Sequence, residues 1–310
     1  MTSRPDKGFL HMLMLLILAL VWGSSFILMK YGMFDQHENP VFRADHVSAL
    51  RLFIAALALS PVALRAMPGL SARDWGWIAL SGITGSGVPA FLFTVAQSRN
   101  DSVLAGILNS LTPFFTLVAA AVVFGRKLDL PKLPGILVGL AGAAVLILMR
   151  LEADPAAGSY LWLIVAATCS YGISVNIITQ RLSEVHPLRI AAVALFITGL
   201  PSAAYFFLSG GTSVIFENDH GMKSLGFICI LALGGTAMAN FLYFKLAQEA
   251  GALFASSVTF LMPLVAIGWG IADNESLTWT YILAAVLMLV GVWLIRNPLN
   301  PAIFGLSKRK

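Results

Sequence analysis

Long apolar runs recur along the whole chain of 310 residues, and polar residues gather in the short links between them. Each run is close to the roughly 20 residues that a helix needs to cross a hydrocarbon core. Only 11% of the residues are charged, against about a quarter in soluble domains. The pattern predicts an all-α membrane protein with ten transmembrane helices, near residues 9–31, 46–66, 74–97, 102–124, 133–150, 159–181, 187–208, 224–247, 252–272 and 277–296.

The sequence also contains an internal repeat. At an offset of 150, residues 91–93 (FLF) align with residues 241–243 (FLY), and Pro113 aligns with Pro263. A long-period repeat indicates duplicated architecture, and five helices in each copy require the second copy to be inverted. The predicted organisation is a first repeat at 9–150, a second repeat at 159–296, and cytoplasmic tails at 1–8 and 297–310.

The fourth and ninth predicted helices each carry a proline near the middle. In ILNSLTPFF, residues 107–115, Pro113 comes four residues after Asn109, and Pro263 comes four residues after Thr259. Proline removes a backbone donor and crowds the carbonyl four residues earlier. Inverted-repeat carriers bind their substrates near the membrane midplane, beside interrupted helices. We therefore predict that both prolines mark helix breaks on the substrate pathway.

Basic residues are distributed unevenly between the two sides that this topology defines. With the N-terminus inside, most of the 20 lysines and arginines, including Arg65, Arg126 and Arg181, fall on the inner side. The other side receives Arg43, Arg99, Arg150 and Lys223. Because basic residues accumulate in the cytoplasm, we expect a multi-pass protein of the cell (inner) membrane with both termini cytoplasmic. This bias accounts for the net charge of +5 without a nucleic-acid partner.

Three segments carry a family resemblance: LVWGSSFILMKYG at 20–32, ALRLFIAALAL at 49–59, and the stretch at 251–295 with Pro263, Glu275 and Gly291. With them the sequence resembles the EamA type of the drug/metabolite transporter superfamily over nearly its entire length. The resemblance implies a ten-helix carrier, commonly an exporter of metabolites, amino acids or drugs, with a central cavity between its halves. The first half departs from the family pattern, because Arg126 stands where an acidic residue is usual.

Neutral polar and aromatic side chains occupy the predicted membrane midplane. A polar side chain in hydrocarbon must find a partner, so each is expected to face another helix or a wet cavity. The candidate substrate-binding residues are Trp22, Ser25, Asn109, Thr112, Tyr171, Asn176, Asn240, Tyr243, Thr259 and Trp269. The alternatives are hydroxyls that bond back to their own helix and aromatic rings that only pack.

Two basic residues are candidates for gating or for pairing with a charged substrate. Arg51 lies inside the second predicted helix and suits a carboxylate, whereas Lys30 lies at the end of the first helix. The alternatives are snorkelling to the membrane interface for Arg51, which aligns with Arg189 of the second repeat, and simple anchoring for Lys30.

No acidic residue or histidine falls at the predicted midplane, where proton-coupled carriers usually bury one. We therefore favour facilitated diffusion or exchange over proton coupling. The favoured function is export of a small metabolite, such as an amino acid or an amphipathic compound, by alternating access. The alternatives are a lipid translocase and an accessory membrane subunit.

Other chemistry finds little support in the sequence. An intramembrane enzyme is disfavoured, because neither HExxH nor GxSxG occurs. Cys169 and Cys229 are isolated within apolar runs, so we expect neither a metal nor another cofactor. The expected partners are a small-molecule substrate and the lipid bilayer. GILVG at 135–139 favours contact between neighbouring helices of one chain, with a homodimer as the alternative.

Overall fold

The structure is a computed structural model that describes residues 7–126 and 130–297. Within these ranges the chain is helical apart from its loops and one isolated bridge between Phe34 and Pro40. Nine helical segments of this part are long and apolar enough to cross a membrane, and a shorter apolar helix at Trp279–Ile295 follows them. The predicted all-α fold with ten membrane helices is confirmed.

The membrane segments of the first repeat are α1 (Lys7–Met33), α2 (Ala44–Ala66), α3 (Ala72–Gly82) with η2 (Ile83–Gly87) and α4 (Val88–Gln97), α5 (Ser102–Leu108) with η3 (Asn109–Leu111) and α6 (Thr112–Val122), and α7 (Leu133–Ala153). Those of the second repeat are α9 (Leu161–Arg181), α10 (Pro187–Leu208), α12 (Gly221–Ile230) with η5 (Leu231–Met238) and α13 (Ala239–Ala250), α14 (Ala252–Ser256) with η6 (Ser257–Phe260) and α15 (Met262–Ala272), and α16 (Trp279–Arg296). The short helices η1 (Met67–Gly69), η4 (Leu130–Lys132), α8 (Pro155–Ser159) and α11 (Gly211–Glu217) lie in the connections or extend the spans. We call the end of the bundle where α1 begins the near end, and the end where α1 finishes the far end.

The third and eighth membrane segments contain π-helical turns at matching positions, η2 and η5. Such turns bend a helix, and glycines in them allow close approach to neighbouring helices. A Cβ at Gly235 would lie 2.6 Å from Ser25 Oγ of α1, and a Cβ at Gly85 would collide with Ser174 Oγ of α9. The two repeats therefore use the same glycine contact, once each, beside the middle of the bundle.

The fourth and ninth segments change to 3-10 helix in the turn before their prolines. η3 precedes Pro113 and η6 precedes Pro263, and each proline lies in the first turn of the α-helix that follows. Proline is tolerated there because the first residues of a helix lack intrahelical acceptors for their N–H groups. The interruption falls between two short helices in both repeats.

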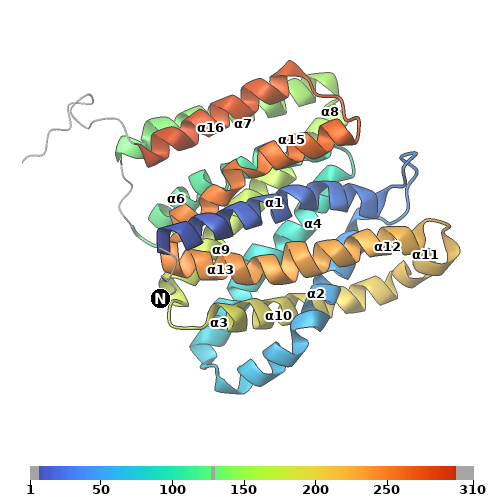
Figure 1. The fold of residues 1–310 in the computed structure, drawn as a ribbon, viewed down its shortest axis with the longest axis horizontal. Coiled ribbons are helices and arrows are strands. Elements are labelled where there is room, and N and C mark those ends of the chain that lie inside the picture. Colours follow the sequence, from blue (N-terminus) through green and yellow to red (C-terminus); the bar gives the residue numbers. More distant parts are fainter. Residues whose placement is uncertain (1–6, 127–129, 298–310) are drawn as a thin grey trace, which may run out of the picture.

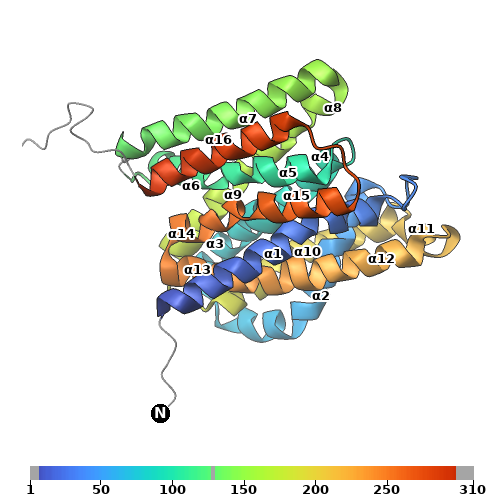
Figure 2. The ribbon, with the colours of Figure 1, turned by 45° about the horizontal axis from the view of Figure 1, so that its top comes forward.

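The helices pair in a symmetrical arrangement. α7 and α16 lie together along one edge of the bundle, and α2 and α10 lie at the opposite edge (Figures 1 and 2). A Cβ at Gly291 would lie 2.6 Å from the Gly135 carbonyl, and a Cβ at Gly199 would lie 2.7 Å from the Leu52 carbonyl. The glycines of GILVG thus contact α16 of the same chain.

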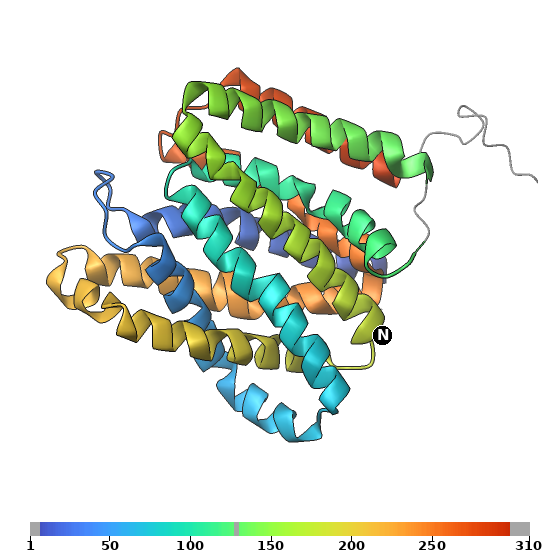
Figure 3. The same ribbon diagram turned by 180° about the vertical axis from the view of Figure 1, so that it is seen from behind.

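The remaining helices fill the space between these two edges. α9 crosses the bundle beside α4 and α6 (Figure 3), and α1 packs in the corresponding way against α12, α13 and α15. The middle of the bundle is therefore surrounded by helices from both repeats.

Candidate functional site

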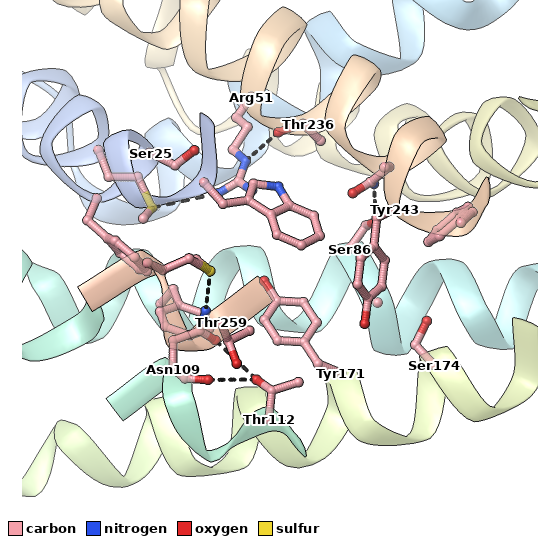
Figure 4. A pocket seen from close by; sticks show the side chains of 18 residues that line it. Ser25, Arg51, Ser86, Asn109, Thr112, Tyr171, Ser174, Thr236, Tyr243 and Thr259 are labelled. Atoms are coloured by element: carbon pink, nitrogen blue, oxygen red, sulfur yellow. Dashed lines mark hydrogen bonds between the residues drawn. The ribbon is translucent and has the colours of Figure 1, made fainter. Parts of the chain in front are cut away.

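A cavity lies in the middle of the bundle, where the two repeats meet (Figure 4). The space within its walls amounts to about 800 Å³, including the part continuous with solvent, which is in the range of small-molecule sites. The structure places these predicted residues on its walls: Trp22, Ser25, Arg51, Asn109, Thr112, Tyr171, Asn240, Tyr243 and Thr259. They come from α1, α2, α9, α13 and the interrupted segments of both repeats.

Arg51 is the one charged side chain among the described residues that line the cavity. Its Nε donates to Thr236 Oγ1 at 2.7 Å, and its Nη1 lies 3.6 Å from Met29 Sδ (Figure 4). The described part of the chain brings no carboxylate within ion-pair distance of this guanidinium. The side chain faces the cavity instead of snorkelling to the membrane interface.

The second repeat supplies no equivalent charge to the cavity. Arg189 is the third residue of α10 and is exposed, whereas Arg51 is the eighth residue of α2. The sequence alignment of the two arginines is therefore not matched by their positions in the fold. The cavity is positive on one side only.

The 3-10 turn of the fourth segment presents an amide to the cavity. Asn109 Nδ2 has only a sulfur acceptor, Met262 Sδ at 3.4 Å, among the described residues. Thr112 Oγ1 donates to the Asn109 carbonyl at 2.8 Å, which compensates in part for the N–H that Pro113 lacks. Thr112 Oγ1 also lies 3.3 Å from Asn109 Oδ1 and can donate to it. Because sulfur is a weak acceptor, the Nδ2 group of Asn109 keeps most of its capacity to donate to a ligand.

Aromatic rings form the other walls of the cavity. Trp22 and Tyr243 lie with ring centroids 4.9 Å apart, and Phe93 stacks on Tyr171 at 5.9 Å. Trp22 Nε1 donates to the Gly235 carbonyl at 2.9 Å, which fixes the indole against η5. These faces suit an apolar side chain or a cation.

Two predicted site residues do not line the cavity. Asn176 donates from Nδ2 to the carbonyls of Thr116 and Gly172, both at 2.8 Å, so its amide joins α9 to α6. Trp269 is 41% exposed on the bundle surface, where its Nε1 donates to Ser24 Oγ at 2.8 Å. Neither residue is among those that line the cavity, because a neighbouring helix satisfies each polar group.

Lys30 lies at the far end, outside the central cavity. Its Nζ is 2.7 Å from Asp273 Oδ2 and 3.4 Å from Glu275 Oε1. Tyr31 Oη also donates to Asp273 at 2.7 Å. Lys30 therefore joins the end of α1 to the connection between α15 and α16, a role beyond simple anchoring.

Glu275 also fixes the start of α5. Its carboxylate accepts from Ser102 Oγ at 2.7 Å, from Ser102 N at 3.3 Å and from Val103 N at 3.2 Å, and its side chain is only 2% exposed. The neighbouring Asp101 accepts from Tyr281 Oη at 3.1 Å. Burial, and then the Glu275 charge, raise the pKa of Asp101 above its ordinary value.

Sequence reasoning did not include several lining residues among the site candidates. These are Phe26, Met29, Gly85, Ser86, Thr236, Phe244 and Met262. Helical spacing from Trp22 would have found Phe26 and Met29, since residues three and four apart share a face. Ser86, which accepts from Asn240 Nδ2 at 2.9 Å, and Thr236 lie in π-helical turns, where that spacing does not hold.

A ten-helix bundle of two repeats, with a polar and aromatic cavity at their interface, is the architecture of a membrane transporter. The chain belongs to the EamA-like transporter family, which it matches over residues 9–148 and 158–297. That family is part of the drug/metabolite transporter superfamily, as the sequence resemblance predicts.

Relatives of known sequence agree with this membership, and a solved structure agrees with the fold. The chain is 28% identical to a probable amino-acid metabolite efflux pump of Salmonella typhimurium (strain LT2), over 94% of this chain and 95% of that protein. It is 25% identical to an uncharacterized inner membrane transporter of Escherichia coli (strain K12), over 93% of each. A solved crystal structure with 16% identity covers 97% of this chain and 99% of its own, with a TM-score of 0.60. The protein is a multi-pass transporter of the inner membrane.

Proposed function

We propose that the protein exports a small metabolite with a carboxylate, such as an amino acid, by alternating access around the central cavity. The observation that carries this proposal is Arg51, a cavity-facing guanidinium with no carboxylate within ion-pair distance in the described chain. An uncompensated charge within a membrane protein is costly. A guanidinium fork also matches a carboxylate better than any neutral group of the cavity does.

The other walls favour a zwitterion over a simple anion. The faces of Trp22 and Tyr171 offer cation–π contacts to an ammonium group. Asn109 offers an Nδ2 donor whose acceptor in the described chain is a sulfur atom. An apolar or amphipathic side chain would pack against Phe93 and Tyr243. The efflux pump of Salmonella typhimurium carries amino-acid metabolites in its name, which supports the same class of cargo.

The distribution of charges supports an orientation in the membrane and a mode of transport. Basic residues such as Arg65, Arg126 and Arg181 gather at the near end, so we place that end and both termini in the cytoplasm. The described cavity lining contains neither an acid nor a histidine. Facilitated diffusion or exchange therefore remains favoured over proton coupling.

Counterflow in proteoliposomes tests the proposal. Purified protein is reconstituted in liposomes loaded with L-leucine, L-phenylalanine or L-threonine, and uptake of the radiolabelled amino acid is followed with and without a pH gradient. Arg51→Ala should lower counterflow at least tenfold, as expected for a lost charge-assisted pair, and Arg51→Lys should restore part of it. Arg189→Ala is the matched control, since that side chain is exposed, and it should retain wild-type rates.

Three results would overturn parts of the proposal. Equal rates in Arg51→Ala would remove the guanidinium from substrate recognition. Flux that depends on the pH gradient would replace uncoupled movement with proton coupling. Scrambling of a labelled lipid, without counterflow of any amino acid, would favour a lipid translocase.

A further inference from the structure

A second pocket lies at the far end of the bundle, apart from the central cavity. Its empty space amounts to about 620 Å³, including the part continuous with solvent. The residues that matter for its chemistry are Lys30, Glu38, Gln97, Arg99 and Asp101. They come from the ends of α1 and α4 and from the loops that follow.

The pocket lies one helical turn beyond the cavity along two helices at once. Phe26 of α1 and Phe93 of α4 line the cavity, whereas Lys30 and Gln97, four residues further along the same helices, line the second pocket. Four residues correspond to an advance of about 6 Å along a helix. The rings of Phe26 and Phe93 lie with centroids 6.0 Å apart. The wall of the cavity therefore continues into the wall of the second pocket along both α1 and α4.

Gln97 is a buried side chain whose amide oxygen lacks a hydrogen-bond donor among the described residues. It is 4% exposed, and its Nε2 donates to the Phe26 carbonyl at 3.0 Å. No donor among the described residues reaches its Oε1. A buried acceptor without a donor destabilises the fold, because it loses its hydrogen bonds to water and gains none in return. The amide orientation is fixed, because only the NH₂ group can bond to a carbonyl.

The charges around this acceptor are mixed. Arg99 is exposed at the rim, while Glu38 and Asp101 line the same space. Lys30 is held by Asp273 and Glu275, so the guanidinium of Arg99 is the better placed cation for a ligand anion. Asp101 uses Oδ2 for Tyr281, and Oδ1 remains for a ligand ammonium. This balance suits a zwitterion better than a cation or an anion.

We propose that this pocket is an external binding site, at which a zwitterionic cargo rests after it passes the Phe26–Phe93 pair. The cargo ammonium pairs with Asp101, and its carboxylate pairs with Arg99. Gln97 Oε1 has almost no exposed surface, so the ammonium donates to it only once the side chains that cover it have moved. The direction of passage and the external position of the far end rest on the proposed function. Binding of a zwitterion at this end does not, and can be measured on its own.

Protection of a single cysteine tests the site in intact cells. Ser98 lines the pocket and is half-buried, so Ser98→Cys is introduced after Cys169→Ala and Cys229→Ala. A membrane-impermeant maleimide is added outside, with L-leucine as the probe ligand and sodium acetate as the anion control. We expect labelling from outside, slowed at least fivefold by L-leucine and not by acetate. The protection should persist in Arg51→Ala.

Further variants link the protection to the pocket. Gln97→Leu and Arg99→Ala should each raise the protecting concentration of L-leucine about tenfold. Arg99→Ala is the safer variant for folding, because that side chain is exposed. The matched controls are Gln248→Leu, at the near end, and Arg43→Ala, at the far end but outside the pocket. Both should leave the protecting concentration unchanged.

Each remaining outcome overturns the proposal. Absence of protection, or protection that ignores Gln97→Leu and Arg99→Ala, would exclude the site. Loss of protection in Arg51→Ala would assign the effect to the central cavity. Failure of the proposed function is read separately, as unchanged counterflow in Arg51→Ala.

Discussion

The two proline-broken segments have the same backbone plan but different chemistry. In the first repeat, the Asn109 carbonyl accepts from Thr112 Oγ1 at 2.8 Å within its own segment. In the second repeat, the Thr259 carbonyl accepts from Ser110 Oγ at 3.0 Å, because Met262 stands at the position equivalent to Thr112. The second break therefore takes a donor from the first. Duplication preserved the bend, while the groups around it diverged to make a one-sided cavity.

The starts of the two broken segments differ as well. At the far end, the Glu275 carboxylate accepts from the first N–H groups of α5 and pairs with Lys30. At the near end, α14 begins after Gly251 without a side-chain cap. Arg126 occupies the position of the first repeat that corresponds to Glu275, and its side chain is exposed. At the far end a buried carboxylate joins α1 to the start of α5. The described chain has no equivalent carboxylate at the start of α14, at the near end.

The largest effect that this comparison predicts is on stability. Glu275→Ala leaves the first N–H groups of α5 without their acceptor, whereas Lys30 keeps its pair with Asp273. We therefore expect the free energy of unfolding to fall by about 1–3 kcal/mol. Arg126→Ala, at the corresponding place in the first repeat, should change it by less than about 0.5 kcal/mol. Equilibrium unfolding of both purified variants in mixed micelles measures the difference. Equal losses of unfolding free energy in the two variants would show that the Glu275 contacts do not stabilise the far end more than Arg126 stabilises the near end.

The central amide gives a smaller effect, on transport. Asn109 faces the cavity with a sulfur partner, whereas Thr259 Oγ1 bonds back to the Ser256 carbonyl at 2.9 Å. We expect Asn109→Ala to raise the half-saturating concentration in counterflow about fivefold, the equivalent of one hydrogen bond of about 1 kcal/mol. Thr259→Ala should raise it less than about twofold. A larger effect of Thr259→Ala would reverse the roles of the two breaks.

Much of the fold could be predicted from the sequence, because each membrane helix corresponds to a continuous apolar run of about 20 residues. The inverted repeat followed from paired residues such as Pro113 and Pro263. The short helix α8 was not predicted as a separate element, since it depends on Asp154 Oδ1, which accepts from Ala157 N at 3.0 Å. A local cap of this kind leaves little signal in hydropathy.

The site was harder to predict than the fold. Residue type correctly suggested that polar groups need partners, but it could not tell a ligand from a neighbouring helix. Asn176 Nδ2 donates to two backbone carbonyls, whereas the acceptor of Asn109 Nδ2 is a sulfur atom. Arg51 faces the cavity, although its sequence counterpart Arg189 is exposed. These outcomes depend on the rotation of each helix, which π and 3-10 turns alter.

The smallest predicted effect is the pH dependence of the far end. Burial and the Glu275 charge raise the pKa of Asp101, so its contribution to stability is lost as pH rises from the ordinary value through the raised one. Asp101→Asn keeps an acceptor for Tyr281 and should make unfolding less dependent on pH there, by about 1 kcal/mol or less. Asp35 gives a control of opposite sign, because bonds from Asn39 hold its pKa at about 2, and its contribution is lost as pH falls from the ordinary value through the lowered one.

Unfolding midpoints between about pH 2 and 7 test both groups. Parallel curves for wild type and Asp101→Asn would remove Asp101 as the pH-sensitive group.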